Sequence, residues 1–231
     1  MTPDTAPPRP PMASWGRLSH VPHTVVPLSS PNTVGVVLER QPHGIPYGLG
    51  RSYGDVCLND GGVLWTTTGL DKFIAFHEGT GVLQCEAGLV LRDIQRMMLP
   101  RGWSLPVVPG TQLVTVGGAI ANDVHGKNHH TAGTFADHVV SLTLMRSDGE
   151  TIVCGPRQQP DLFAATVAGI GLTGLPMLMR GDIDGFFVFY ESKTALERDR
   201  APLHYLPGDD FAPMPGDALI TGRAFAEDPR N

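Results

Sequence analysis

The sequence predicts an α+β fold in which hairpin strands and short helices are mixed, rather than an uninterrupted series of parallel βαβ units. Two segments, residues 72–88 and 138–155, each carry two apolar runs on either side of a turn, the pattern of a β-hairpin. Residues 91–103 carry apolar side chains at helical spacing instead. These three segments set the fold class.

The strands are predicted from short apolar runs and the turns beside them. The first hairpin is expected to turn at Glu78–Gly81 and the second at Ser147–Gly149. Residues 24–40 mix β-branched residues with turn formers, and either a short strand or a short helix fits them. Residues 42–55 are dense in glycine and proline and predict repeated turns, whereas residues 62–70 predict a strand with an exit turn.

Helices are predicted before and after the second hairpin. Apolar residues repeat at helical spacing from Leu91 to Met98, and the proline and glycine that follow end the pattern. A further helix is predicted within residues 158–171, entered at Asp161 and closed by Gly169 and Gly171. Beyond about residue 181 the sequence shows little periodicity.

Composition excludes several classes of function. The chain has 231 residues, of which 41% are apolar, and a formal net charge of −6. This mildly acidic balance argues against nucleic acid or a membrane surface as a partner. The three cysteines form no CxxC pair, so we expect thiols rather than a disulfide framework. No signal peptide or transmembrane segment is apparent, and a cytoplasmic protein is expected.

The segment Tyr47–Asp55, YGLGRSYGD, has three glycines that allow backbone amides to approach a ligand closely. Amides that turn inward make a concave nest for phosphate oxygens, and Arg51 adds a permanent cation. A glycine-rich surface turn is the alternative. The Rossmann fingerprint and the P-loop pattern are both missing from the sequence.

A second glycine cluster lies in residues 108–126, VPGTQLVTVGGAIANDVHG. Thr115 is expected to cap a helix, and Gly117 and Gly118 would let the amides of that helix start press against an anion. Together with the first segment, this helix start is expected to clasp the two phosphates of a dinucleotide. Residues 169–175, GIGLTGL, form a third close-approach loop.

These motifs, together with SWGR at residues 14–17, resemble one known family. GLGRSYGD, TVGGAIANDVHGKNHHTAGTF and DLFAATVAGIGLTGL are similar to segments of the decaprenylphosphoryl-β-D-ribose 2′-oxidase group. That group belongs to the FAD-linked oxidases that resemble vanillyl-alcohol oxidase and the aldonolactone oxidases. The resemblance runs in order from about residue 14 to residue 180.

The resemblance implies an α+β FAD-binding domain of the vanillyl-alcohol-oxidase-like type, with two α+β subdomains and FAD between them. It divides the chain into a disordered tail (residues 1–13), the FAD-binding domain (residues 14–180) and a short remnant of a substrate domain or an irregular tail (residues 181–231). The residues implied to contact FAD are Pro46, Tyr47, Gly48, Leu49, Gly50, Arg51, Ser52, Tyr53, Gly54, Asp55, Val56, Gly110, Thr111, Thr115, Val116, Gly117, Gly118, Asn122, Asp123, Val124, His125, Gly174 and Pro176.

Two of these positions, Arg51 and Pro176, differ from the residues usual in the family. Many relatives carry a histidine at the position of Arg51 and bond FAD covalently through it. A guanidinium makes no such bond but pairs with phosphate, so the sequence predicts non-covalent FAD. Pro176 stands where an aliphatic residue is usual.

The histidine-rich segment leaves several roles open. His125 is implied to lie near the flavin and is the candidate catalytic residue together with Lys127, which either stabilises the reduced flavin or is a surface cation. His125 and His129 are four residues apart, a spacing that also suits a metal, but Gly126 interrupts it and no carboxylate or thiol partner is evident. We expect no metal, and a packing role for His129 and His130.

The resemblance implies an FAD-dependent oxidoreductase that acts on the CH–OH group of a sugar alcohol, such as a polyprenyl-phosphoryl sugar or an aldonolactone. The alternatives are a truncated FAD-binding module without activity of its own, which a partner subunit would complete, and an interaction protein without a cofactor.

Overall fold

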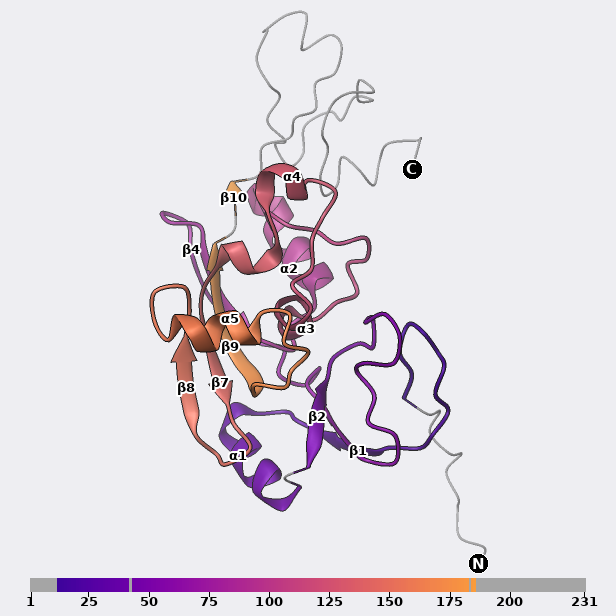
Figure 1. Ribbon diagram of the computed structural model, residues 1–231. Coiled ribbons are helices and arrows are strands. Elements are labelled where there is room, and N and C mark those ends of the chain that lie inside the picture. Colours follow the sequence, from indigo (N-terminus) through magenta and orange to yellow (C-terminus); the bar gives the residue numbers. More distant parts are fainter. Residues whose placement is uncertain (1–11, 42, 183, 186–231) are drawn as a thin grey trace, which may run out of the picture.

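The computed structural model describes residues 12–41, 43–182 and 184–185 (Figure 1). They form two sheets of different kinds, which confirms the α+β prediction. The smaller sheet has three parallel strands and the larger sheet has five antiparallel strands. Among these residues, no helix has both the length and the apolar content needed to cross a bilayer.

The parallel sheet is built by the first part of the described chain. Its order is β1 (Thr24–Pro27), β3 (Val63–Thr66) and β2 (Gly44–Tyr47), with the helix α1 (Pro31–Arg40) between β1 and β2. Residues 24–40 therefore contain both a strand and a helix. The prediction of repeated turns throughout residues 42–55 is wrong for β2, which forms because β3 supplies a parallel partner.

The antiparallel sheet has the order β4, β5, β9, β7, β8. Its two hairpins are as predicted. One joins β4 (Phe73–His77) to β5 (Val82–Glu86), and the other joins β7 (Val139–Met145) to β8 (Thr151–Cys154).

The central strand of this sheet, β9 (Leu175–Asp182), was not predicted. It pairs with β5 on one side and with β7 on the other. The β7–β9 register shifts where Leu144 faces Pro176, because proline has no amide for the ladder. A further short pair joins β6 (Trp103–Ser104) to β10 (Asp184–Gly185).

Short helices cover the antiparallel sheet (Figure 1). The predicted helix α2 (Leu91–Met98) is confirmed and is followed by the 3₁₀ helix η1 (Leu99–Arg101). The remaining helical segments are α3 (Val116–Ala121), α4 (His129–Ala132), η2 (Phe135–His138) and α5 (Pro160–Thr166). The α5 helix begins one residue before the expected Asp161 and ends before the expected glycines, since Val167 is already extended.

Two hydrophobic clusters form the core. The larger one packs α2, α3 and η2 against the antiparallel sheet. The smaller one joins Val34 and Leu38 of α1 and Trp65 of β3 to Leu175 and Met177 of β9. Because β9 contributes to this second cluster, the two sheets share apolar contacts.

Candidate functional site

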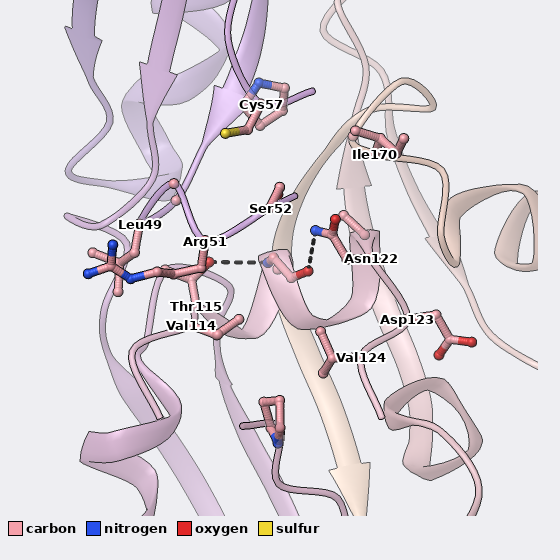
Figure 2. Close-up of a pocket in the computed structure, with 18 of the residues that line it drawn as sticks. Leu49, Arg51, Ser52, Cys57, Val114, Thr115, Asn122, Asp123, Val124 and Ile170 are labelled. Atoms are coloured by element: carbon pink, nitrogen blue, oxygen red, sulfur yellow. Dashed lines mark hydrogen bonds between the residues drawn. The ribbon is translucent and has the colours of Figure 1, made fainter. Parts of the chain in front are cut away.

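A cleft of about 630 Å³ lies where loops from both sheets meet. Its walls come from the loop after β2, from the segment 109–125 that contains α3, and from the residues that precede and begin β9. Figure 2 shows Arg51 and Leu49 on the loop side, with Asn122, Asp123 and Val124 toward the C-terminal end of α3. The volume falls within the range of about 300–1,000 Å³ that is usual for small-molecule pockets.

Most of the residues implied by the resemblance line this cleft. They are Pro46, Gly48, Leu49, Gly50, Arg51, Ser52, Tyr53, Gly110, Thr111, Thr115, Gly117, Gly118, Asn122, Asp123, Val124, His125 and Pro176. The three glycine segments, distant in sequence, thus meet at one cavity. Pro176 lies in the wall despite its departure from the usual residue type.

Some predicted site residues lie outside the lining. Among them, Val116 is fully buried in the core, and the Tyr47 hydroxyl donates to the carbonyl of Ala13 at 2.6 Å. The carboxylate of Asp55 accepts hydrogen bonds from an N-terminal segment, and Lys127 is exposed. The predicted residues outside the lining are Tyr47, Gly54, Asp55, Val56, Val116, Lys127 and Gly174.

Other lining residues had no predicted role. Trp15 lies in the SWGR motif, which supported the resemblance but suggested no contact for this side chain. The others are small, apolar or thiol side chains that give no pattern in a sequence. The additional lining residues are Trp15, Cys57, Thr67, Ala87, Pro109, Val114, Ala121, Ile170 and Gly171.

The loop between Gly48 and Cys57 offers unused backbone donors. Within the described part of the chain, no protein oxygen accepts a hydrogen bond from any backbone amide of these residues. Arg51, Tyr53, Gly54 and Val56 are exposed, so water can pair with amides at these positions. Amides without a protein acceptor beside a cleft are free to donate to an anionic ligand. Arg51, on the same loop, adds a fixed positive charge.

Two glycines of this loop are required by close packing. A Cβ at Gly48 would lie 2.6 Å from the Oγ1 of Thr115, so this glycine allows the loop to rest against the start of α3. Gly50 has a φ of 63°, and a Cβ there would collide with the Ala13 carbonyl and the Tyr47 hydroxyl. The predicted nest geometry therefore depends on both residues.

The expected phosphate-binding role of the α3 amides is wrong. Val116 N donates to Leu89 O at 2.9 Å, and Gly117 N donates to Ala87 O at 2.7 Å. Gly118 N donates to the Thr115 Oγ1 at 3.1 Å, which is the predicted cap (Figure 2). Since these donors are already paired with the β5–α2 connection and the cap, Gly117 and Gly118 contribute a surface without side chains rather than an anion site.

Two titratable side chains near the loop are perturbed by burial. Burial raises the pKa of the Cys57 thiol, and it also raises the pKa of the Tyr47 phenol. Both groups therefore stay neutral near pH 7. Of the charged side chains on this loop, Arg51 lines the cleft, whereas the carboxylate of Asp55 is turned to the N-terminal segment.

The histidine-rich segment contributes His125 to the lining of the cleft. His125 is exposed and lines the cavity, and its ring stands 5.4 Å from that of His129 in an edge-to-face arrangement. His129 Nδ1 is 3.1 Å from the carbonyl of Gly126, and His130 packs against His129. Across the described residues, no group of three or more possible ligands is arranged to hold a metal ion.

Comparison with known proteins identifies the family. The family model described as FAD binding domain matches residues 32–155, more than half of the chain. The chain belongs to this family. FAD is accordingly its cofactor, and the FAD binding domain is the fold that the two sheets build.

The relatives are oxidoreductases. The chain is 39% identical over 179 residues to decaprenylphosphoryl-beta-D-ribose oxidase of Mycolicibacterium smegmatis, covering 75% of this chain and 38% of that protein. It is 29% identical over 130 residues to L-gulonolactone oxidase of Mus musculus, covering 55% and 29% respectively. It is 28% identical over 131 residues to D-lactate dehydrogenase of Anaerostipes hadrus, covering 57% and 26%. The chain therefore spans well under half the length of these relatives.

The residues of the cleft fit the cofactor of an FAD binding domain. FAD carries a doubly charged diphosphate. The unpaired amides of the loop 48–57 offer it neutral hydrogen-bond donors, and Arg51 offers a positive charge. The side-chain-free surface at Gly117 and Gly118 and the apolar wall at Ile170 and Pro176 suit the flat faces of its ring systems.

Proposed function

We propose that this chain binds FAD non-covalently in the cleft and serves as an oxidoreductase that acts on the CH–OH group of a sugar alcohol. The observation that carries the proposal is the run of unpaired amides from Gly48 to Cys57 beside Arg51, in a chain that belongs to the FAD binding domain family. Two of the relatives are named as oxidases of a ribose derivative and of a gulonolactone, which motivates the substrate class.

Two groups of lining residues would have separate roles. Residues 48–53, which line the cleft, would hold the diphosphate through their amides, with Arg51 as its counter-charge. When bound, FAD supplies the acceptor for the hydride that leaves an alcohol carbon. The exposed imidazole of His125, which also lines the cleft, would accept the hydroxyl proton of the substrate.

The first test is a visible absorption spectrum of the purified chain under anaerobic conditions. We expect flavin bands that bleach when a suitable aldonolactone or sugar alcohol is added. Bands that persist with every alcohol would support an FAD-binding module without activity of its own. A protein that neither carries nor takes up flavin would contradict the proposal.

Substitutions at two histidines, one in the cleft lining and one outside it, distinguish a catalytic role from a role in FAD binding. We expect His125→Ala to slow bleaching by roughly 10²–10⁴-fold, the usual contribution of a general base, while the bound flavin is retained. His130→Ala is the control, because His130 is also exposed but does not line the cleft. Equal bleaching rates in the two variants would remove His125 from the proposed role.

The non-covalent linkage follows from Arg51. After acid precipitation we expect all flavin absorbance in the supernatant and a colourless protein pellet, since a guanidinium forms no bond to the cofactor. We expect Arg51→Gln to bind FAD about tenfold more weakly through loss of a charge-assisted contact. Arg40→Gln, on the exposed end of α1, is the control.

A further inference from the structure

The N-terminal segment 13–23 lies along the loop that carries the unpaired amides. Six hydrogen bonds join residues 13–23 to residues 47–60, and each involves a side chain. The Tyr47 hydroxyl donates to Ala13 O at 2.6 Å, and the Ser19 hydroxyl donates to Asp60 at 2.6 Å. Asn59 N donates to the His23 Nε2 at 3.2 Å. The segment precedes residues 32–155, the part of the chain that matches the family model.

Asp55 is the centre of this contact. Its carboxylate accepts hydrogen bonds from the Ser14 hydroxyl, from Ser19 N at 2.6 Å and from Leu18 N at 3.5 Å. The Ser14 oxygen in turn accepts from Gly16 N at 3.1 Å, which tightens the turn around it. One carboxylate therefore fixes the path of the whole turn 14–19.

A close backbone approach joins the same two segments beside Asp55. A Cβ on Gly16 would lie 2.9 Å from the carbonyl oxygen of Gly54 and 3.0 Å from its Cα. These are backbone atoms, which have no flexible end that can move aside. Glycine at position 16 is therefore needed for the turn to rest on the loop.

The loop has little structure of its own to maintain its shape. Residues 48–60, all of which the structure describes, share a single backbone–backbone hydrogen bond, in which Leu58 N donates to Asp55 O at 2.9 Å. The segment that rests on the loop also reaches the cleft, because Trp15 lines the cavity, and its neighbour Ser14 is buried. The shape of the loop therefore depends on its neighbours.

We infer that residues 13–23 act as a clamp that holds the loop 48–60 in the shape that binds the diphosphate, and that Asp55 is its positioning residue. This inference rests on the proposed binding of FAD in the cleft. The clamp would keep the donors of the loop pre-organised, which reduces the ordering cost of binding.

Cys57 reports the state of the loop without any cofactor. Its thiol is half-buried in the cleft, whereas Cys85 and Cys154 are 0% exposed. In the folded protein a thiol reagent should modify Cys57 alone. Opening of the loop would expose this thiol and relieve the burial that raises its pKa, so the labelling rate measures how well the clamp holds.

The experiment compares labelling of the cofactor-free protein with its affinity for FAD. We expect Asp55→Ala and Gly16→Ala each to raise the labelling rate of Cys57 about tenfold and to weaken FAD binding by a similar factor. Asp55→Asn, which keeps one acceptor oxygen, should recover part of both effects. The controls are Asp148→Ala, which loses a carboxylate that accepts Glu150 N in a distant turn, and Gly79→Ala, where a Cβ meets nothing within 4 Å.

The outcomes distinguish the clamp from the proposed function. Unchanged labelling of Cys57 in both Asp55→Ala and Gly16→Ala would overturn the clamp. Faster labelling of all three thiols together in both variants would also overturn the clamp. The contacts of Asp55 and Gly16 would then stabilise the whole fold rather than the loop. If added FAD fails to protect Cys57 in the unaltered protein, the proposed binding fails, while the labelling rates without cofactor still decide the clamp.

Discussion

The hydrogen bonds that Asp55 accepts from the turn 14–19 hold the pKa of its carboxyl below the ordinary value of 3.8, and the Ser14 hydroxyl has the largest effect. A carboxyl whose pKa is lower in the folded state stabilises that state while it is ionised. That contribution is complete well above pH 3.8 and is lost as the pH falls through the lower, folded value. Asp55 should therefore stabilise the protein at neutral pH.

We predict a pH-dependent difference between the unaltered protein and Asp55→Asn. Without FAD, the unaltered protein should have the higher melting temperature at pH 5–7, because only the carboxylate accepts all three hydrogen bonds as an anion. The difference should shrink below about pH 4, because the carboxyl is protonated first in the unfolded chain and only at lower pH in the folded protein. Melting curves of both proteins across this range provide the measurement. A constant difference down to pH 3 would show that the charge of Asp55 contributes nothing.

Adjacent methionines on α2 allow a matched test of packing. Met98 is 0% exposed in the larger core cluster, whereas Met97 is 41% exposed on the same helix. We expect Met98→Ala to lower the free energy of unfolding by about 2–5 kcal/mol, because it leaves a cavity. Met97→Ala should change it by less than about 0.5 kcal/mol. Denaturant unfolding measures both, and equal losses would mean that α2 packs with a different face.

Two glycines should respond in opposite directions to the same substitution. Gly35 lies in the middle of α1, and a Cβ there meets nothing within 4 Å. Gly35→Ala should stabilise the protein by about 0.5–1 kcal/mol through reduced freedom of the unfolded chain. A Cβ on Gly88 would strike the carbonyl oxygens of Thr67 and Leu70, so Gly88→Ala should destabilise it. Thermal melts test the pair, and a loss of stability in Gly35→Ala would contradict the assignment of α1.

Elements with local partners could be predicted, and those with distant partners could not. Both hairpins pair segments joined by short turns, and the turn at Ser147–Gly149 is visible in the sequence because Gly149 takes a φ of 85°. The strand β9 pairs with β5, about ninety residues earlier, and contains Pro176, which argues against a central strand. Nothing in the sequence near residues 175–182 specifies these neighbours.

The site, like the fold, has features that the sequence predicts and features that depend on contacts between distant segments. Glycine-rich segments predicted the loop 48–57 and α3 as parts of the site, because a close backbone approach requires glycine and glycine is visible in the sequence. The sequence did not show that the α3 amides are paired with Leu89 and Ala87, because those carbonyls belong to a connection that only the fold brings near. It gave no sign of the clamp either, since Ser14 and Asp55 are forty-one residues apart.

The cleft takes its walls from loops of both sheets, so a ligand bound there should stabilise the whole fold rather than one part. FAD at one hundred times its dissociation constant should add about 2.7 kcal/mol to the free energy of unfolding. For a protein of this size, that corresponds to a rise of about 5–10 °C in melting temperature. Thermal melts over a series of FAD concentrations provide the measurement.

FMN is the matched ligand for this experiment, because it shares the flavin ring but carries a single phosphate. If the loop 48–57 and Arg51 hold the diphosphate, FMN should raise the melting temperature much less than FAD at equal concentration. Arg51→Gln should narrow that difference, since it removes the charge that favours the second phosphate. Equal shifts with FAD and FMN would mean that the ring alone is bound and that the unpaired amides have another purpose. A larger shift with FAD, reduced in Arg51→Gln, would tie the diphosphate to this loop.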